Sequence, residues 1–147
     1  MKKKKLLMLL CALVLGAWIG PLRADPGGAI DLRVMSFNIR VLNTSDAAEN
    51  QWTNRADNVC ALITELQPDV LGLQEAVPQQ YEDVKAGLDG YVSIFAGRDD
   101  GTKGEGTPIF YKADMFRLVD SGHFWLSPTP NQPSIGWNAS CNRIAVW

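Results

Sequence analysis

The sequence lacks internal repeats, low-complexity tracts and any stretch typical of a linker. Their absence excludes a repeat array and a string of separate domains. Residues 25–147, which follow an N-terminal leader, are enough for one modest hydrophobic core. The composition stays globular to the last residue, where 143–147 has the pattern of a strand. We therefore expect a single domain.

Histidine and cysteine are scarce. The only histidine, His123, lies in the stretch Gly-His-Phe-Trp, where nothing marks it as catalytic, and we interpret it as structural. Of the three cysteines, Cys11 belongs to the leader, which leaves Cys60 and Cys141. A disulfide between these two is one interpretation, because export permits disulfides. A buried, apolar Cys60 within a helix is the other.

The leader has the features of a secretory signal peptide. Four lysines follow Met1, an uncharged apolar run covers 6–20, and the small residue Ala24 closes the segment. The apolar run is shorter than the roughly 20 residues that a membrane span needs. We predict a signal peptide at 1–24 and an exported protein, periplasmic or secreted, with no stable membrane span after cleavage. An uncleaved N-terminal anchor is the alternative.

Positive charge is also in short supply once the leader is set aside. Five of the 14 basic residues, and none of the 16 acidic ones, lie in 1–24, so nine basic and 16 acidic residues remain and the net charge is −7. This is the wrong sign for a protein that holds nucleic acid by neutralising phosphates. It suits a protein that gathers carboxylates around a cation, or one that is simply soluble.

Hydrophobic patterns predict an α/β domain of strands flanked by helices. Apolar residues at helical spacing (Val59, Leu62, Ile63 and Leu66) indicate a helix that Pro68 terminates. The predicted helices are 52–66 and 78–88, and the predicted strands are 32–39, 69–75, 91–96, 108–111, 116–119, 123–126 and 143–147. Glycine-rich and proline-rich stretches predict loops at 97–106 and 127–142.

Two polar residues stand out because they interrupt or end strands that are otherwise apolar. Asn38 lies near the end of the first strand, and Glu75 closes the second. The intervening helix suggests a βαβ-like unit with neighbouring strands, although an antiparallel return is also compatible. A carboxylate beside an amide at a strand end is a good start for a Mg²⁺ site, because Mg²⁺ prefers oxygen ligands and often takes one or two carboxylates. The alternative is that both residues only cap turns.

Several stretches resemble the motifs of a known family. They are Ser-Phe-Asn-Ile-Arg at 36–40, Trp52 with Arg55, Pro-Asp-Val-Leu-Gly-Leu-Gln-Glu at 68–75, Gly-Glu-Gly-Thr-Pro-Ile-Phe-Tyr at 104–111, Phe-Trp-Leu-Ser at 124–127 and Arg-Ile-Ala-Val-Trp at 143–147. In this order they resemble the endonuclease/exonuclease/phosphatase superfamily over nearly all of 31–147. The resemblance implies a two-sheet β-sandwich flanked by helices, here only partial, with about half of the strands present.

The resemblance also implies roles for individual residues. Glu75 matches the principal ligand of Mg²⁺ (or Mn²⁺), and Asn38 matches the amide that helps to position metal and phosphate. Glu105 matches a second acidic residue that orients the catalytic histidine, with a solvated loop charge as the alternative. Arg143 either faces the substrate phosphate or forms a salt bridge at a sheet edge. The implied activity is metal-dependent hydrolysis of a phosphoester.

The sequence also departs from the family pattern. The general base, an Asp/His pair late in the chain, is missing, and so are the Asn-Thr-His and Gly-Asp-Phe-Asn stretches. Family members are roughly twice this length. We therefore expect an N-terminal part of the domain at 25–147, inactive by itself and prone to self-association through exposed sheet edges.

Two functional interpretations follow. The first is a phosphoester hydrolase acting on a small molecule, a phospholipid headgroup or a nucleic acid, with the negative charge favouring the small phosphoesters. The second is a non-catalytic secreted module that binds or dimerises through half of the fold.

Overall fold

The computed structural model describes residues 30–147, and the compact unit that carries the fold is Asp31–Trp147. The predicted signal peptide lies outside the described residues. No helix in the described part of the chain is long and apolar enough to cross a membrane.

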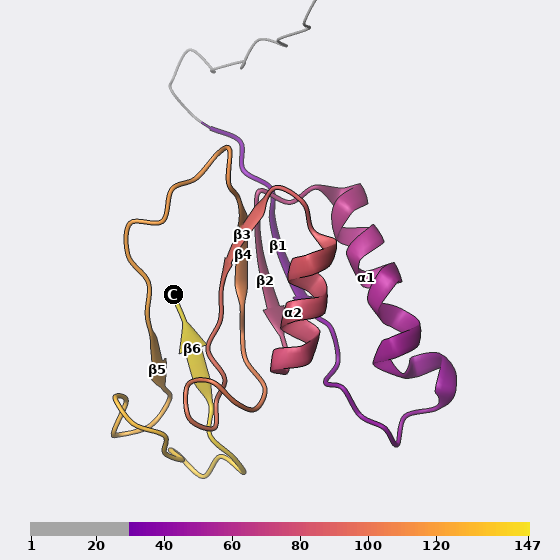
Figure 1. Ribbon diagram of the computed structural model, residues 1–147. Helices are drawn as coiled ribbons and strands as arrows, with labels where there is room; N and C mark the ends of the chain where they lie inside the picture. Colours follow the sequence, from indigo (N-terminus) through magenta and orange to yellow (C-terminus); the bar gives the residue numbers. More distant parts are fainter. Residues whose placement is uncertain (1–29) are drawn as a thin grey trace, which may run out of the picture. The chain divides into compact units, whose positions relative to one another are not determined.

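A four-stranded mixed sheet forms the centre of this unit (Figure 1). The strand order is β1-β2-β4-β3, in which β1 and β2 are parallel and the other neighbours are antiparallel. The strands are β1 (Val34–Asn38), β2 (Val70–Gln74), β3 (Tyr91–Ile94) and β4 (Ile109–Lys112). The predicted βαβ-like unit is therefore confirmed with its parallel return.

Two helices, α1 (Trp52–Leu66) and α2 (Pro78–Gly87), lie on the same side of this sheet (Figure 1). The bounds of α1 agree with the sequence prediction. Its end is set by Gln67, which adopts a left-handed conformation (φ 46°) and donates its N–H to the Ile63 carbonyl, followed by Pro68. The main core joins both helices to the sheet through Ile39, Trp52, Val59, Ile63, Leu71, Leu73, Val84 and Phe110.

The apolar face of α1 is narrower than its sequence predicts. Val59 and Ile63 are buried, whereas Leu62 and Leu66 are 39% and 48% exposed. The indole N–H of Trp52 donates to the Asp83 carboxylate at 2.7 Å and links α1 to α2.

A buried carboxylate joins three strands at the end of the sheet where β1 begins. Asp69 is 7% exposed and accepts hydrogen bonds from the Arg33 N–H and from Lys112 Nζ, both at 2.8 Å. These two bonds hold the pKa of Asp69 below its usual value. Since they connect the residues that precede β1 and β2 to the end of β4, they help to fix how the first two strands lie side by side.

A second, smaller sheet lies on the side of the first sheet away from the helices (Figure 1). It pairs β5 (His123–Trp125) with β6 (Ile144–Val146) in antiparallel register. Its buried residues are Trp125 and Ile144, which pack with Ala96 of the central part of the chain. The fold is thus an α/β arrangement with one mixed sheet and one small sheet, as predicted.

The strand predicted at 116–119 is wrong. These residues form no ladder, and Val119 is 88% exposed. Their composition favours a strand, but a strand needs a hydrogen-bonding neighbour, and none of the described strands pairs with this segment. Only Phe116 is anchored, by an edge-to-face contact with Tyr111.

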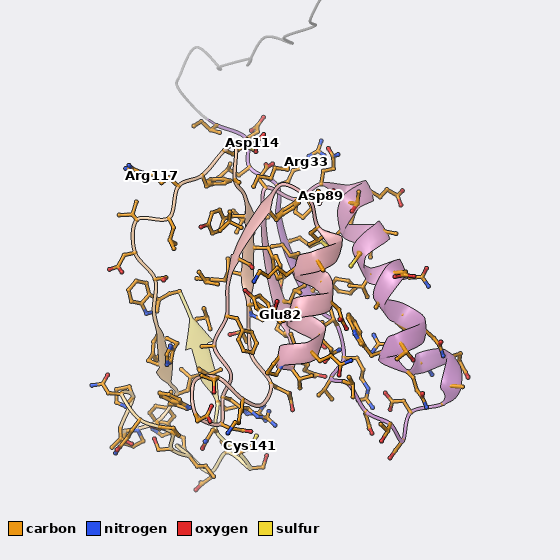
Figure 2. All side chains as sticks on the ribbon, in the orientation of Figure 1. Arg33, Glu82, Asp89, Asp114, Arg117 and Cys141 are labelled. Atoms are coloured by element: carbon orange, nitrogen blue, oxygen red, sulfur yellow. The ribbon has the colours of Figure 1, made fainter. Side chains whose placement is uncertain are left out.

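The two cysteines of the described residues, Cys60 and Cys141, are both free, so the disulfide interpretation is not supported. Cys60 packs against Gly87 where α1 and α2 approach each other: a Cβ at Gly87 would lie 2.6 Å from the Cys60 sulfur. Cys141 belongs to the loop before β6, at the end of the molecule opposite Arg33 and Asp114 (Figure 2).

The different burial of two neighbouring residues in α1 gives a test of this packing. Ile63→Ala removes a side chain with no exposed surface and is expected to lower the free energy of unfolding by about 2–5 kcal/mol. Leu62→Ala, the matched control, should cost much less, because Leu62 is partly solvated already. Urea unfolding followed by circular dichroism measures both. Equal losses would contradict the placement of α1.

Candidate functional site

The ends of β1 and β2 bring the first two predicted site residues together. Because β1 and β2 are parallel, with Asn38 opposite Gln74, both strands end at the same edge of the sheet. The Asn38 side-chain amide donates from Nδ2 to Glu75 Oε1 at 2.9 Å. The parallel return thus places both side chains at one edge of the sheet, as a βαβ-like unit would.

The backbone turns sharply after each of these two strands. Arg40 and Glu75 adopt left-handed backbone conformations, with φ of 60° and 62°. Such a conformation costs a residue other than glycine roughly 1–2 kcal/mol. At Glu75 the left-handed conformation also ends the alternation of side chains along β2. The carboxylate therefore points back towards the end of β1. Strain of this kind concentrates at functional sites, where the surroundings enforce it.

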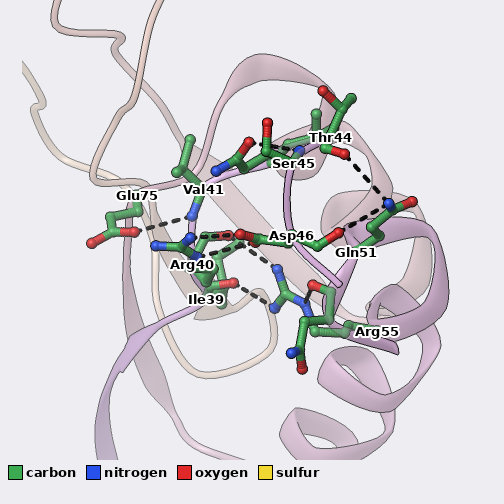
Figure 3. A network of polar contacts seen from close by, with 12 residues as sticks. Ile39, Arg40, Val41, Thr44, Ser45, Asp46, Gln51, Arg55 and Glu75 are labelled. Carbon is green, nitrogen blue, oxygen red and sulfur yellow. Dashed lines mark hydrogen bonds and ion pairs between the residues drawn. The ribbon is translucent and has the colours of Figure 1, made fainter. Parts of the chain in front are cut away.

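The Glu75 carboxylate is held by two donors. Asn38 occupies Oε1, and the backbone N–H of Val41 donates to Oε2 at 3.0 Å (Figure 3). These bonds, supported by the positive charges of Arg40 and Arg98, hold the pKa of Glu75 below its usual value. The carboxylate is therefore ionised at neutral pH. Each oxygen makes one hydrogen bond and keeps acceptor capacity for another partner.

The amide of Asn38 is committed at both ends. Its oxygen, Oδ1, accepts the backbone N–H of Arg40 at 2.8 Å, while its nitrogen faces Glu75. In this arrangement Asn38 supports the carboxylate and the turn at Arg40 at the same time. The prediction that it is also a metal ligand stays a prediction.

A polar strap covering 39–51 crosses from β1 to α1 and includes the short helix η1 (Ala48–Asn50). Arg40 holds Asp46 with two bonds, from Nε at 3.1 Å and from Nη2 at 2.7 Å, and this pair lowers the pKa of Asp46. Arg55 of α1 donates to three backbone carbonyls of the strap: Ile39 and Asn50 at 2.7 Å and Arg40 at 3.3 Å (Figure 3). The strap is thereby fixed on both sides of its turn.

The four predicted site residues lie around one cavity. It has a volume of about 230 Å³ and is lined by Asn38, Gln74, Glu75, Arg98, Glu105, Gly106, Thr107, Asn142, Arg143 and Ile144. A larger cavity of about 620 Å³ lies among Gln67, Asp89, Lys112 and Asp114 and contains none of the predicted residues. We place the candidate site at the smaller cavity because the chemically distinctive groups converge there.

Glu105 reaches this cavity in a salt bridge. Its Oε1 lies 2.7 Å from Nη2 of Arg98, and both side chains are mostly shielded from solvent. The loop that carries them is held beside Glu75 because the Gly106 N–H donates to the Ala76 carbonyl at 2.7 Å. Glu105 is therefore a paired charge that faces the site, which argues against a freely solvated loop residue.

Arg98 and Arg143 give the cavity two cations. The Arg98 carbonyl accepts bonds from the Trp125 indole and the Asn142 amide, which ties its loop to β5 and to the approach to β6. Arg143 itself is exposed, and within residues 30–147 it forms no salt bridge. The sheet-edge salt bridge considered for Arg143 is thus not formed, and its guanidinium is available to an anion.

The donor set fits a hard divalent cation held by a single carboxylate. No three acidic, histidine or cysteine side chains gather anywhere in the described part of the chain, which does not favour a protein cage with many charges. Mg²⁺ characteristically uses one or two carboxylates and completes its shell with water and phosphate oxygens. The buried hydroxyl of Thr107, which has no hydrogen-bond partner, adds a polar group to the same cavity wall.

Sequence reasoning missed two residues of the site. Arg98 lies in the stretch 97–106, for which the sequence predicts only a loop, and Gln80 lies in the predicted helix 78–88. Neither carries a local signal, because their partners Glu105, Arg40 and Leu42 are recognised only in three dimensions. His123 lies outside the cavity, edge-to-face with Trp125, in accordance with a structural role.

Comparison with known proteins identifies the family. The profile of the Endonuclease/Exonuclease/phosphatase family matches residues 35–143, which is most of the chain. The chain belongs to this family. The match begins in β1 and extends to Arg143, so it includes every residue predicted for the site.

Two solved structures and one further relative agree with this family assignment. An endonuclease/exonuclease/phosphatase from Bacteroides vulgatus is 43% identical, with a TM-score of 0.78 over 81% of this chain and 46% of its own. A mannosyl-6-phosphatase from Bacteroides thetaiotaomicron is also 43% identical, with a TM-score of 0.76 over 80% of this chain and 45% of its own. An uncharacterized protein of Acanthamoeba polyphaga mimivirus is 34% identical over 69% of this chain and 17% of its own. The chain spans less than half the length of each.

Removal of the Asn38 amide tests the electrostatics of the site. In Asn38→Ala, Glu75 loses the strongest influence on its pKa, so that pKa should rise towards its ordinary value of 4.5. A carboxylate whose pKa is lower in the folded state stabilises the fold above the unfolded pKa, and this contribution disappears as the pH falls through the folded pKa. The variant should therefore lose less stability than the wild type on acidification below about pH 4.5.

Titration of the ¹³C-labelled carboxyl groups by NMR measures the pKa of Glu75 directly. Ser36→Ala is the control, because Ser36 lies on the same strand and contacts Gln74 rather than Glu75. An unchanged Glu75 pKa in Asn38→Ala would refute the geometry.

Proposed function

We propose that this chain carries the cation-binding side of a metal-dependent phosphoester hydrolase site. The observation that supports the proposal is the ionised Glu75 carboxylate, held by Asn38 and the Val41 N–H on the wall of a cavity that also contains Arg98 and Arg143. In this proposal Glu75 is the principal ligand of Mg²⁺ or Mn²⁺. Asn38 positions the carboxylate and is the candidate for a second contact to metal or phosphate.

In this proposal some groups of the cavity bind the phosphate and others orient the groups around it. The bound cation would supply an acidified water and neutralise charge on phosphorus. Arg143 has the free guanidinium to hold phosphate oxygens, for which its planar donors are well suited. Arg98 fixes the position of the Glu105 carboxylate through their salt bridge. The cation and these side chains would lower the activation barrier to hydrolysis by orienting the phosphoester and by stabilising the charge that develops on it.

No histidine or aspartate is among the residues that line the cavity. His123 is the only histidine of the sequence and lies elsewhere on β5. Positioned proton transfer typically contributes 10²–10⁴-fold. We infer that residues 30–147 by themselves support cation binding with little turnover.

A sugar phosphate is the substrate class we favour. The net charge of −7 over 25–147 disfavours a long polyanion, and a relative with 43% identity is a mannosyl-6-phosphatase. The small volume of the cavity agrees with a monoester headgroup. Phospholipid headgroups and nucleic acids are the competing substrate classes.

Substitution of Glu75 tests the proposed function. Glu75→Gln keeps the size of the side chain and removes its charge, so Mn²⁺ binding followed by electron paramagnetic resonance should be abolished. Any release of phosphate from mannose 6-phosphate should be lost with it. Glu65→Gln, on the exposed surface of α1, is the control and should change neither. Wild-type binding and turnover in Glu75→Gln would exclude the proposal.

Export is the second part of the proposal, and it rests on the leader at 1–24 alone. Expression in a bacterium followed by fractionation should place the protein in the periplasm or the medium. Its N-terminal sequence should then begin at Asp25, because cleavage is expected after Ala24. A protein that keeps Met1 and stays with the membrane would favour the uncleaved anchor.

A further inference from the structure

Gln80 is a buried polar residue that joins the two loops of the site. It lies in the first turn of α2 and has no exposed surface. Its side-chain Nε2 donates to the Arg40 carbonyl at 2.8 Å, and its Oε1 accepts the N–H of Leu42 at 2.8 Å. The same oxygen accepts the N–H of Val77 at 3.3 Å. Burial of an amide is costly unless it is hydrogen-bonded, and here three backbone groups satisfy it.

The loops that Gln80 joins are those that follow the two strand ends. Arg40 and Leu42 come directly after β1, and Val77 comes two residues after Glu75. The two bonds to the first loop fall on either side of Val41, whose own N–H donates to Glu75 Oε2. Gln80 therefore holds two consecutive peptide units (Figure 3 shows Val41 and Glu75). The first joins Arg40 to Val41 and contains the N–H that donates to the carboxylate, and the second joins Val41 to Leu42.

We propose that Gln80 is a positioning residue: by holding Arg40 and Leu42 it aims the Val41 N–H at Glu75 and thereby sets the affinity of the site for a divalent cation. The inference rests on the proposed role of Glu75 as metal ligand. Groups that orient metal ligands through hydrogen bonds often change metal affinity 10–100-fold when they are removed. The left-handed conformation of Arg40 is held in place by the same contact.

A simpler role for Gln80 is that of a helix cap. As the third residue of α2, its oxygen accepts the N–H of Val77, which precedes the helix, as in one half of a capping box. The bond to Val77 is the longest of the three, however. A helix cap also does not require the hydrogen bond from Gln80 Nε2 to the Arg40 carbonyl. The two shorter bonds both go to the loop after β1, which lies 38 and 40 residues away in the sequence.

The two roles predict different patterns of amide hydrogen exchange. In Gln80→Met, which matches the length of the side chain and removes both polar atoms, a positioning role predicts that the Val41 N–H loses protection. A cap predicts losses at Val77 and in the first turn of α2, with Val41 unchanged. Gln80→Asn keeps an amide but shortens the side chain, and it serves if the Met variant does not fold.

The control is Val84→Ala, one turn further along α2. Val84 is also fully buried, but it belongs to the apolar core and makes no contact with either loop through a hydrogen bond. The Val84→Ala substitution lowers stability without altering the polar contacts. Any change in exchange or affinity that it shares with the Gln80 variants therefore reflects stability alone.

The experiment combines this exchange measurement by NMR with Mn²⁺ titration by electron paramagnetic resonance. We expect the Mn²⁺ dissociation constant to rise roughly tenfold or more in the Gln80 variants, together with faster exchange at Val41, and to stay within about twofold of wild type in Val84→Ala. Unchanged Val41 exchange and unchanged affinity would overturn the inference. If the wild type binds no Mn²⁺, the proposed function fails, whereas the exchange at Val41 still decides whether Gln80 holds the loop.

Discussion

The parallel pairing of β1 with β2 is the constraint on which the candidate site depends. With Asn38 opposite Gln74, the first residue beyond β2 is Glu75, and its carboxylate meets the Asn38 amide at 2.9 Å. A shift of one residue in this register would move every side chain of β1 to the other face and separate the pair. The packing of α1 and α2 on one side of the sheet, and Asp69 at its opposite end, keep the register fixed.

The site is built mainly from backbone turns held by side chains. Arg40 and Glu75 both adopt left-handed conformations that are unfavourable for their residue types. Arg55 and Gln80 donate to the carbonyls of the loop after β1 and so stabilise this geometry from two directions. An ionised carboxylate kept in one orientation would lose little freedom on binding a cation, and this pre-organisation agrees with the proposed role of Glu75.

Around this centre the charges are distributed unevenly. The protein as a whole is acidic, yet the cavity beside Glu75 holds Arg98 and Arg143, and the first of these is paired with Glu105. A local pair of cations on an acidic protein suits a small phosphate that enters a confined site better than a long polyanion that must lie along the surface.

The sequence by itself determined the features that depend on nearby residues. Helical spacing and Pro68 defined α1, and the apolar runs before Asn38 and Glu75 defined two strands that a βαβ-like unit would place side by side. The parallel return, which brings these two side chains together, was decided by the structure. The segment 116–119 was misread because a strand also needs a partner, which no local pattern specifies. Only the tertiary structure decided that Arg98 pairs with Glu105 and that Gln80 spans both loops. A hydrogen bond or salt bridge depends on where two distant segments meet, and that is fixed by the packing of the whole fold.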